Sequence, residues 1–462
     1  MKYFKSGRFY AKLKSAAFFL ILISLSDSII AQSEVLKWMD GKTSAISITF
    51  DGGTINQFKV ALPILNEFNM PATFYIVTGD IKDAKHRGEF IGRSVFEIIE
   101  EAKSIKTNRD NLFERAVAIR YLESSDGRLH HTRAGDLFEL GRVADACREI
   151  DAAFAKYSRG DLKKDMPGNL FHNPDVDISW DELKVIEADG HEFGSHSVTH
   201  PQLGIYDTEN MKYELLMAKE EIEENLGRRH TFSAEIPHGI ENPRVMEFAN
   251  RYIPTLRNRL SLPYLQEINR WSRVTPYGSG RHYIQWQRGP RSSTSLDIMK
   301  SWADTCMKYN NVWLVLTFHG IDGIGYEPKT SADFRSFVSY VNENKDKFWI
   351  ATFQDVVKYI KIRMASSVTQ MVETLDVEGD RTEIMNTDKV PIRIFVALRN
   401  NLDKEIYNTP LTLKTYLPPE WKDATIVYKG EILPHKTGSD KNGKYVIYNT
   451  FPNTTSVIIS RR

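Results

Sequence analysis

The chain has 462 residues, of which 41% are hydrophobic and 26% charged, with a formal net charge of +1. This balance is typical of globular proteins and excludes a disordered, collagenous or disulfide-scaffold chain. The two cysteines, Cys147 and Cys306, have no CxxC or other metal-ligand spacing, so the sequence indicates no cysteine-based zinc or redox site. The length leaves room for two or three domains.

The N-terminus has the pattern of a secretory signal peptide. Residues 1–14 carry five basic residues and no acidic one, and the apolar run AAFFLILISL follows at residues 16–25. This run is too short for a stable membrane span, so we expect a signal peptide over 1–31 and a secreted or periplasmic protein, with a membrane anchor as the alternative. Without residues 1–31 the formal charge is −3, which does not suit a nucleic-acid partner.

Strand and helix patterns alternate through the first three quarters of the chain. The segment AISITFDGG at 45–53 predicts a strand that ends in a tight loop, and a helix over 57–68 leads to a second strand at 71–80. Such repeated units predict an α/β fold, a (β/α) barrel within residues 32–364, with its working face at the carboxyl ends of the strands. Further strands are predicted around Phe193 and Phe232, at 312–320 and at 348–353, with helices such as 210–226 and 332–342 between them.

Two regions depart from this alternation. Residues 81–178 contain helical periods at 95–106, 111–123 and 134–157, which predicts a helical insertion in the barrel. Residues 365–462 contain short β-rich runs bounded by turn residues, which predicts a small all-β sandwich domain. This last domain could contact sugars or have a structural role, and the sequence leaves both possibilities open.

Three polar clusters lie where strands are predicted to end. They are Thr49–Gly53, His196–His200 and Thr317–Gly320. Two histidines four residues apart on a helical turn point the same way and can share one divalent cation, which a carboxylate and water complete. The glycine and serine before His196 and the proline after His200 indicate a strand-to-turn setting, which favours a ligand role.

In order and spacing, these clusters resemble the polysaccharide deacetylase family, whose NodB homology domain is a distorted (β/α) barrel. The resemblance covers residues 45–80 and 179–360. It implies a divalent metal, usually zinc, and hydrolysis of acetyl groups from sugars. Matched residue by residue, it assigns Asp51 as the base, His196 and His200 as metal ligands and His319 as the acid.

The chain departs from the family pattern at three places. Gly52 stands where the family has the aspartate that completes the metal site, and glycine has no side chain to act as a ligand. Glu235, in the segment Glu235–Gly239, replaces the arginine that positions the base, and His238 is the adjacent candidate catalytic or substrate-orienting residue. No counterpart of the family's aspartate and tryptophan motif occurs between residues 255 and 295.

That last stretch is rich in arginine. Residues 251–291 contain eight arginines, no lysine and one acidic residue, Glu267. Since a guanidinium pairs bidentately with carboxylates and sulfates, this bias predicts recognition of an acidic glycan, with a solvated or internally paired surface as the alternative. The substrate-binding candidates are Arg257, Arg259, Trp286, Arg288 and Arg291.

Three functions follow from these patterns. The first is an exported deacetylase that acts on an acidic poly- or oligosaccharide. The second is a lyase or dehydratase that eliminates water from a terminal uronic acid, with Asp51, Glu235, His238 and His319 as candidate base and acid. The third is a carbohydrate-binding protein without activity, against which the retention of four polar residues at strand ends argues.

Overall fold

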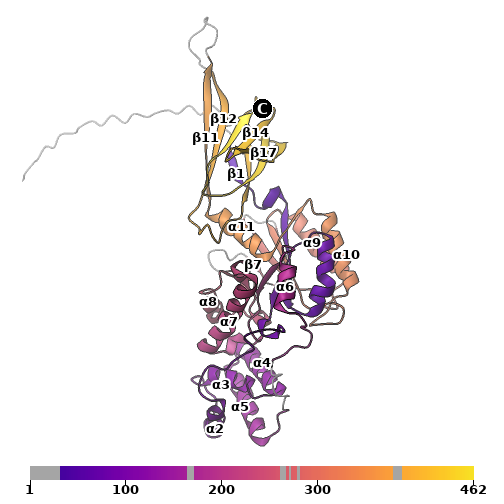
Figure 1. Ribbon diagram of the computed structural model, residues 1–462, viewed down its shortest axis with the longest axis vertical. Coiled ribbons are helices and arrows are strands. Elements are labelled where there is room, and N and C mark those ends of the chain that lie inside the picture. The colour runs from indigo at the N-terminus through magenta and orange to yellow at the C-terminus, as the bar shows by residue number, and fades with distance from the viewer. Residues whose placement is uncertain (1–31, 164–170, 261–266, 270–271, 278–280, 378–387) are drawn as a thin grey trace, which may run out of the picture.

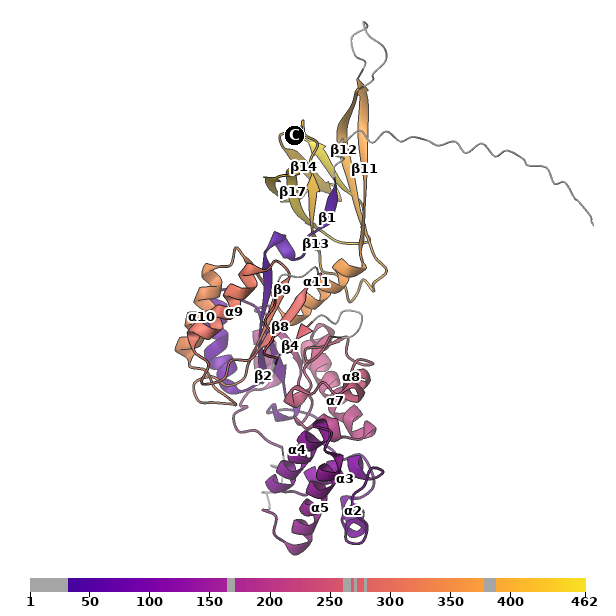
Figure 2. The same cartoon turned by 180° about the vertical axis from the view of Figure 1, so that it is seen from behind.

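The computed structural model describes residues 32–462 except 164–170, 261–266, 270–271, 278–280 and 378–387. The predicted signal peptide, residues 1–31, lies outside the described residues. The molecule is elongated, with a helical region at one end, an α/β region in the middle and a β-rich region at the other end (Figures 1 and 2).

Among the described residues, the middle region contains a sheet of nine strands that pair in parallel. Its order is β6-β5-β4-β3-β2-β9-β8-β7, and β10 also pairs with β2. This curled sheet with its covering helices confirms the predicted distorted (β/α) barrel. The strands are β2 Ser44–Gly52, β3 Ala72–Ile76, β4 Glu192–Ser195, β5 Ser233–Ala234, β6 Thr255–Leu256, β7 Glu267–Ile268, β8 Ile284–Arg288, β9 Val312–Phe318 and β10 Phe348–Ile350.

Seven α-helices accompany these strands among the described residues. The predicted helix over 57–68 begins as a π-helical segment, Gln57–Ala61, and continues as α1 Leu62–Glu67. The others are α6 Trp180–Glu187, α7 Thr208–Leu226, α8 Pro243–Ala249, α9 Leu296–Lys308, α10 Ser331–Glu343 and α11 Phe353–Ala365. In the part of the chain that the structure describes, no helix has both the length and the apolar character that crossing a membrane requires.

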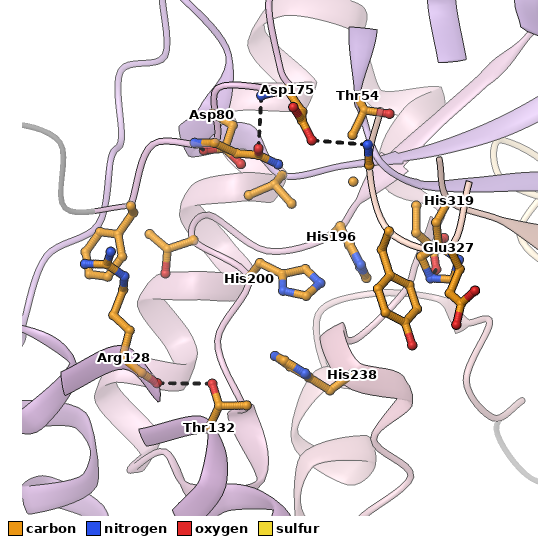
Figure 3. Close-up of a pocket in the computed structure, with 18 of the residues that line it drawn as sticks. Thr54, Asp80, Arg128, Thr132, Asp175, His196, His200, His238, His319 and Glu327 are labelled. Carbon is orange, nitrogen blue, oxygen red and sulfur yellow. Dashed lines mark hydrogen bonds and ion pairs between the residues drawn. The ribbon is translucent and has the colours of Figure 1, made fainter. Parts of the chain in front are cut away.

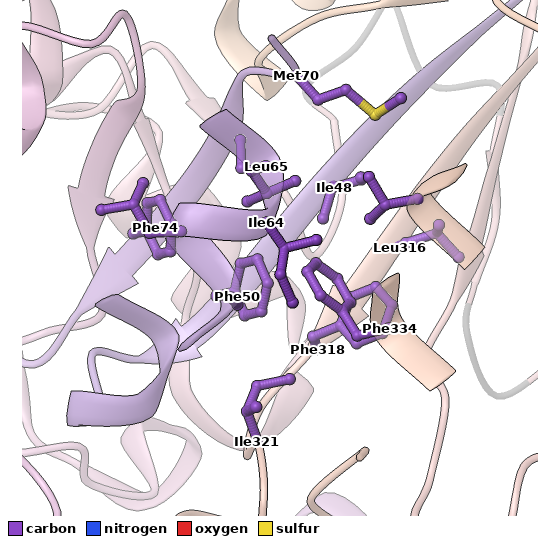
Figure 4. Packing of buried hydrophobic residues seen from close by; sticks show 14 of the residues in the cluster. Ile48, Phe50, Ile64, Leu65, Met70, Phe74, Leu316, Phe318, Ile321 and Phe334 are labelled. Atoms are coloured by element: carbon purple, nitrogen blue, oxygen red, sulfur yellow. The ribbon is translucent and has the colours of Figure 1, made fainter. Parts of the chain in front are cut away.

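Aromatic packing around Phe50 holds β2 in the middle of the sheet. The Phe50 ring stacks on Phe74 of β3 at 5.1 Å and on Phe318 of β9 at 5.5 Å, measured between ring centroids. Phe334 of α10 meets Phe50 edge-on at 5.6 Å (Figure 4). Since Phe50 is fully buried, these contacts fix the position of the next residue, Asp51, at the carboxyl end of the strand.

The helical insertion follows β3 and contains no strand among its described residues. Its helices are α2 Val95–Ala102, α3 Leu112–Arg120, α4 Ser125–Glu139 and α5 Val143–Arg159, which share a hydrophobic core of their own. The helical period predicted over 134–157 is divided between two helices, because α4 ends and α5 begins around Gly141. This glycine has a φ of +73°, a left-handed conformation that ends a helix at little steric cost.

The C-terminal strands form two sheets around a second core, as the predicted β-sandwich requires. One sheet has the order β11-β12-β18-β14-β15 and the other β1-β13-β17-β16. The strand β1, Ser33–Val35, belongs to the second sheet although it lies next to the barrel segment in sequence. The remaining strands are β11 Ser367–Val377, β12 Asp388–Arg399, β13 Leu411–Tyr416, β14 Ala424–Tyr428, β15 Glu431–Ile432, β16 Lys436–Asp440, β17 Gly443–Thr450 and β18 Val457–Arg461.

A buried carboxyl group in the barrel makes stability depend on pH. Glu192 of β4 accepts hydrogen bonds from the Thr73 hydroxyl at 2.8 Å, from the backbone N–H of Gln354 at 3.0 Å and from the Ser233 hydroxyl. Burial raises the pKa of Glu192 to about 7 from its ordinary 4.5. The folded state therefore retains a proton that the unfolded state releases, so this stability is complete below pH 4.5 and is lost as the pH rises through 7.

We expect Glu192→Gln to flatten the fall in stability between pH 5 and pH 8, because the variant has no proton to lose. The substitution should remove at most about 3 kcal/mol of the pH-dependent decrease in the free energy of unfolding. Urea unfolding at several pH values measures this free energy. The control is Glu97→Gln, a substitution of an exposed residue on α2. A pH profile of Glu192→Gln parallel to that of the native protein would contradict the prediction.

Candidate active site

A pocket of about 740 Å³ lies at the carboxyl ends of the barrel strands. It is bounded by barrel loops on one side and by α3, α4 and the segment after α5 on the other. Its polar lining residues include Asp51, Thr54, Asp80, Arg120, Arg128, Thr132, His172, Asn173, Asp175, His196, Thr199, His200, His238, Arg291, His319 and Glu327, and its rings include Phe171 and Tyr326.

Asp51 lines this pocket and pairs with Arg257, a buried arginine that lies outside the lining. The Arg257 guanidinium donates to Asp51 Oδ2 at 2.6 Å and to the Glu235 carboxylate at 3.0 and 3.1 Å. It also donates to the Thr49 hydroxyl and lies 4.9 Å from the centroid of the Tyr75 ring. Arg257 is fully buried, so this guanidinium neutralises two carboxylates in a site of low dielectric.

This arrangement compensates for one departure from the family pattern. The arginine expected at position 235 is a glutamate, and the guanidinium comes instead from Arg257, just beyond the next strand, β6. Burial opposes ionisation of Asp51, but Arg257 and then His196 and His319 hold the pKa of its carboxyl well below its usual range. Asp51 is therefore an anion at neutral pH.

His319 follows β9 and lies beside Asp51 in the pocket lining. Its Nε2 lies 3.7 Å from Asp51 Oδ2, and its ring meets that of Tyr326 edge-on with centroids 5.3 Å apart. The side chain is 27% exposed, so it reaches the pocket space that Asp51 borders. A carboxylate beside an imidazole stabilises the imidazolium, which suits His319 to proton transfer.

A side chain that sequence reasoning missed ties these two strand ends together. The Gln57 amide donates to the backbone oxygens of Asp51 and His319, each at 2.7 Å. Gln57 is fully buried, and it lies in the π-helical segment after the first polar cluster. The sequence signal for Gln57 was its polar side chain on the buried face of a predicted helix, where apolar residues are usual.

Three imidazoles gather beside Asp51. The ring centroids of His196 and His200 are 4.7 Å apart, and those of His200 and His238 are 4.8 Å apart. His196 contacts the Glu235 backbone oxygen through Nδ1 at 2.8 Å. Burial lowers the pKa of His196 to about 4 and that of His200 well below its ordinary value, so both rings are neutral at neutral pH.

The first two histidines lie in the predicted strand-to-turn setting, and not on a turn of helix. Residues 196–200 form a loop after β4, in which Ser197 and His200 have φ angles of +67° and +54°. This left-handed backbone is unfavourable for a non-glycine residue, and it brings the two rings together without a helix. His238, with a φ of +62°, approaches from a different loop.

The family's metal does not fit the described side chains. Gly52 contributes no ligand, and the Asp51 carboxylate beside it is bound by Arg257. Among the residues that the structure describes, no three or more His, Cys, Asp or Glu side chains are arranged to hold a metal ion. We therefore derive no chemical step through a metal at His196 and His200.

Of the five substrate-binding candidates, the structure places one, Arg291, in the pocket lining. Arg257 is instead the buried partner of Asp51, and Arg259 lies 3.9 Å from Glu267 outside the lining. Trp286 offers no platform for a sugar, because it is 1% exposed and belongs to the barrel core.

Arg288, another substrate-binding candidate, also contacts protein atoms and lies outside the pocket lining. Its guanidinium donates to the backbone oxygens of Ser272, Val274 and Gln287 at 3.0 to 3.2 Å and lies 4.5 Å from the centroid of the Trp286 ring. Burial lowers its pKa. Because side chains alternate along β8, Trp286 and Arg288 lie on the same face of the strand and pack against protein. The number of arginines in the sequence could not reveal this orientation.

Together, the fold and the site define an α/β-barrel protein with a polar pocket at its strand ends. The sequence model described as "Polysaccharide deacetylase" matches residues 39–108 and 160–253. The match leaves out residues 109–159, which hold α3, α4 and α5. Over these residues the chain is similar to the polysaccharide deacetylase family, which supports a divergent member of that family and a carbohydrate-active enzyme.

Known proteins resemble the chain at low identity. A gellan lyase of Bacillus sp. is 22% identical over 289 residues, which are 60% of this chain and 11% of that protein, so the chain spans about a tenth of its length. A putative polysaccharide deacetylase of Mycobacterium smegmatis is 15% identical with a TM-score of 0.38, covering 72% of this chain and 94% of the other. A family 4 carbohydrate esterase of Bacillus subtilis is 13% identical with a TM-score of 0.30, covering 68% and 81%. Structural likeness at these scores defines no reaction.

Proposed function

We propose that this protein is an exported carbohydrate-active enzyme that eliminates water from a terminal uronic acid of an oligosaccharide. One observation carries the proposal: Asp51 and His319 face each other at 3.7 Å in the pocket while Gly52 stands where the family has a metal-ligating carboxylate. Elimination requires proton transfer and neutralisation of the substrate carboxylate, and side chains alone supply both. The proposed export rests on the pattern of residues 1–31.

In this reaction the C5–H and C4–O bonds of the uronic acid break and a C4=C5 double bond forms. His319 takes the C5 proton, since the Asp51 carboxylate stabilises the resulting imidazolium. His238 acts as the general acid and gives a proton to the departing hydroxyl, which leaves as water. Arg291 neutralises the substrate carboxylate and so makes the adjacent proton acidic. The name of the gellan lyase relative supports this class of reaction.

Deacetylation of an acidic glycan is the second candidate. It is favoured by the Arg257–Asp51 pair, which restores the charge that the family arginine gives to the base. Asp51 would take a proton from water, and His319 would protonate the sugar atom that leaves the acetyl group. Of the two candidate reactions, only deacetylation would use zinc held by His196 and His200.

Mass spectrometry of uronic-acid and acetylated oligosaccharides distinguishes the two reactions, with ultraviolet absorbance recorded at the same time. We expect the uronic-acid oligosaccharide to lose the mass of one water and to gain absorbance from a conjugated double bond. Chelator should leave this reaction unchanged, and an oligosaccharide with reduced carboxyl groups should not react. Loss of an acetyl mass that chelator abolishes would contradict elimination and establish the deacetylase.

A further inference from the structure

Gly52 leaves an open space beside the reacting groups. It ends β2 next to Asp51, it lines the pocket, and its φ is +94°. A Cβ atom at Gly52 would have no atom of the described residues within 4 Å, its chain neighbours aside. Gly53 differs, because a Cβ atom there would lie 3.2 Å from the Ile76 side chain. The end of β2 at Gly52 therefore has room for a ligand atom where a side chain would otherwise stand.

His196 lines the same pocket from the end of β4. The strand register pairs Gly52 with Ile76 of β3 and Ile76 with Ser195, so Gly52 and His196 flank the end of β3. The Nδ1 atom of His196 contacts the Glu235 backbone oxygen at 2.8 Å. Because a carbonyl oxygen can only accept, Nδ1 carries the hydrogen of the neutral ring, and Nε2 keeps a lone pair.

That lone pair has no hydrogen-bond donor within the described part of the chain. His196 is 3% exposed, and the contact through Nδ1 is the one hydrogen bond of its ring among the described residues. In the view of Figure 3, His196 and His200 lie in the middle of the lining, with Thr54 and Asp175 on one side and His238 on the other. A buried acceptor without a donor costs free energy, so a ligand that brings a donor binds favourably here.

We propose that a hydroxyl group of the substrate sugar enters the space beside Gly52 and donates its hydrogen to His196 Nε2, so that the chain binds its sugar at the place where the family pattern has a metal. Two imidazoles without a neighbouring carboxylate ligand hold zinc weakly. A hydroxyl fits better, because it supplies the missing donor and uses the room that an aspartate side chain would fill.

This inference rests on the proposed function for the identity of the sugar. In a terminal uronic acid that loses its C4 hydroxyl, the hydroxyls that remain are those at C2 and C3. One of these two is therefore the group that we assign to His196. The contact holds the sugar and takes no part in proton transfer, so binding tests it.

Calorimetry in a His319→Gln background, in which the sugar is not consumed, uses a galacturonic acid disaccharide and its analogues without the C2 or the C3 hydroxyl of the terminal unit. We expect His196→Asn to raise the dissociation constant of the full disaccharide about tenfold. The asparagine amide can still donate to the Glu235 oxygen in place of Nδ1, but it has no counterpart of Nε2. One of the two analogues should bind equally well with and without the substitution. His282→Asn is the control, since His282 is exposed and lies outside the pocket lining.

A zinc titration tests the same position without a sugar. Gly52→Asp adds the carboxylate that the chain lacks, so we expect it to bind Zn²⁺ about tenfold or more tightly than the native chain and to bind the disaccharide more weakly. Gly52→Asn is the matched control, because it brings the same size and the same backbone strain without the charge. It should weaken sugar binding and gain little affinity for zinc.

Three results would overturn the inference. They are equal effects of His196→Asn on all three sugars, no binding of the disaccharide to the His319→Gln parent, and zinc binding by the native chain as tight as that of a folded Gly52→Asp protein. Absence of water loss with the native protein would instead refute the proposed reaction and leave the binding result standing.

Discussion

Replacement of Asp51 by asparagine should reduce turnover of the oligosaccharide substrate by about 10²- to 10⁴-fold. The asparagine side chain keeps the shape of the carboxylate but removes the charge that stabilises a protonated His319, 3.7 Å away. It also leaves the Arg257 charge with Glu235 as its remaining carboxylate partner. Product formation followed by mass spectrometry measures the effect.

Binding of the sugar to Asp51→Asn separates an enzyme from a carbohydrate-binding scaffold. A scaffold would bind equally before and after the substitution and would turn over nothing in either form. Asp177→Asn is the control, since Asp177 is exposed and pairs with Lys82 outside the pocket lining. Unchanged turnover in Asp51→Asn would remove Asp51 from the mechanism of either candidate reaction.

Replacement of Arg257 by leucine should destabilise the protein by about 3–5 kcal/mol, because it leaves the Asp51 and Glu235 carboxylates buried without their shared cation. Burial alone would lower the pKa of Arg257, but these two carboxylates raise it above its ordinary value. The loss therefore reports the pairing of charges inside the barrel. Urea unfolding at neutral pH measures the free energy of unfolding.

A second substitution tests the cause of that loss. Glu235→Gln combined with Arg257→Leu removes one of the stranded charges and should recover part of the stability, whereas simple loss of packing would leave it unrecovered. Arg259→Gln, a nearby arginine whose side chain is 43% exposed, should change stability by less than about 0.5 kcal/mol. A fully stable Arg257→Leu variant would show that the pair is not needed for folding.

The barrel and its polar strand ends could be predicted because they depend on local patterns. Alternation in residues 45–53 predicts a strand that ends near Asp51, and β2 ends at Gly52. His319 follows β9 and His196 follows β4 as expected. Parallel strands bring their carboxyl ends to one edge, so residues distant in sequence meet there.

Other features could not be predicted because they depend on distant contacts. The Arg257–Asp51 pair joins residues about 200 positions apart, and the sequence pattern alone grouped Arg257 with the substrate-binding candidates. Trp286 is buried because of the face of the sheet on which its side chain lies. The register of β8 with its neighbouring strands sets that face. The contact between the His196 and His200 rings depends on left-handed loop residues, which the HxxxH spacing alone does not reveal.

By itself, the sequence determined the class of fold, the helical insertion, the β-rich C-terminal region and the strand ends that carry Asp51, His196 and His319. Only the tertiary structure decided which cation holds Asp51, which arginines reach the pocket and that α4 forms its far wall. The physical reason is the separation along the chain over which each effect acts. Hydrophobic periodicity and turn residues act over a few positions, whereas ion pairing and pocket formation depend on the side chains that the whole fold brings within a few ångströms of one another.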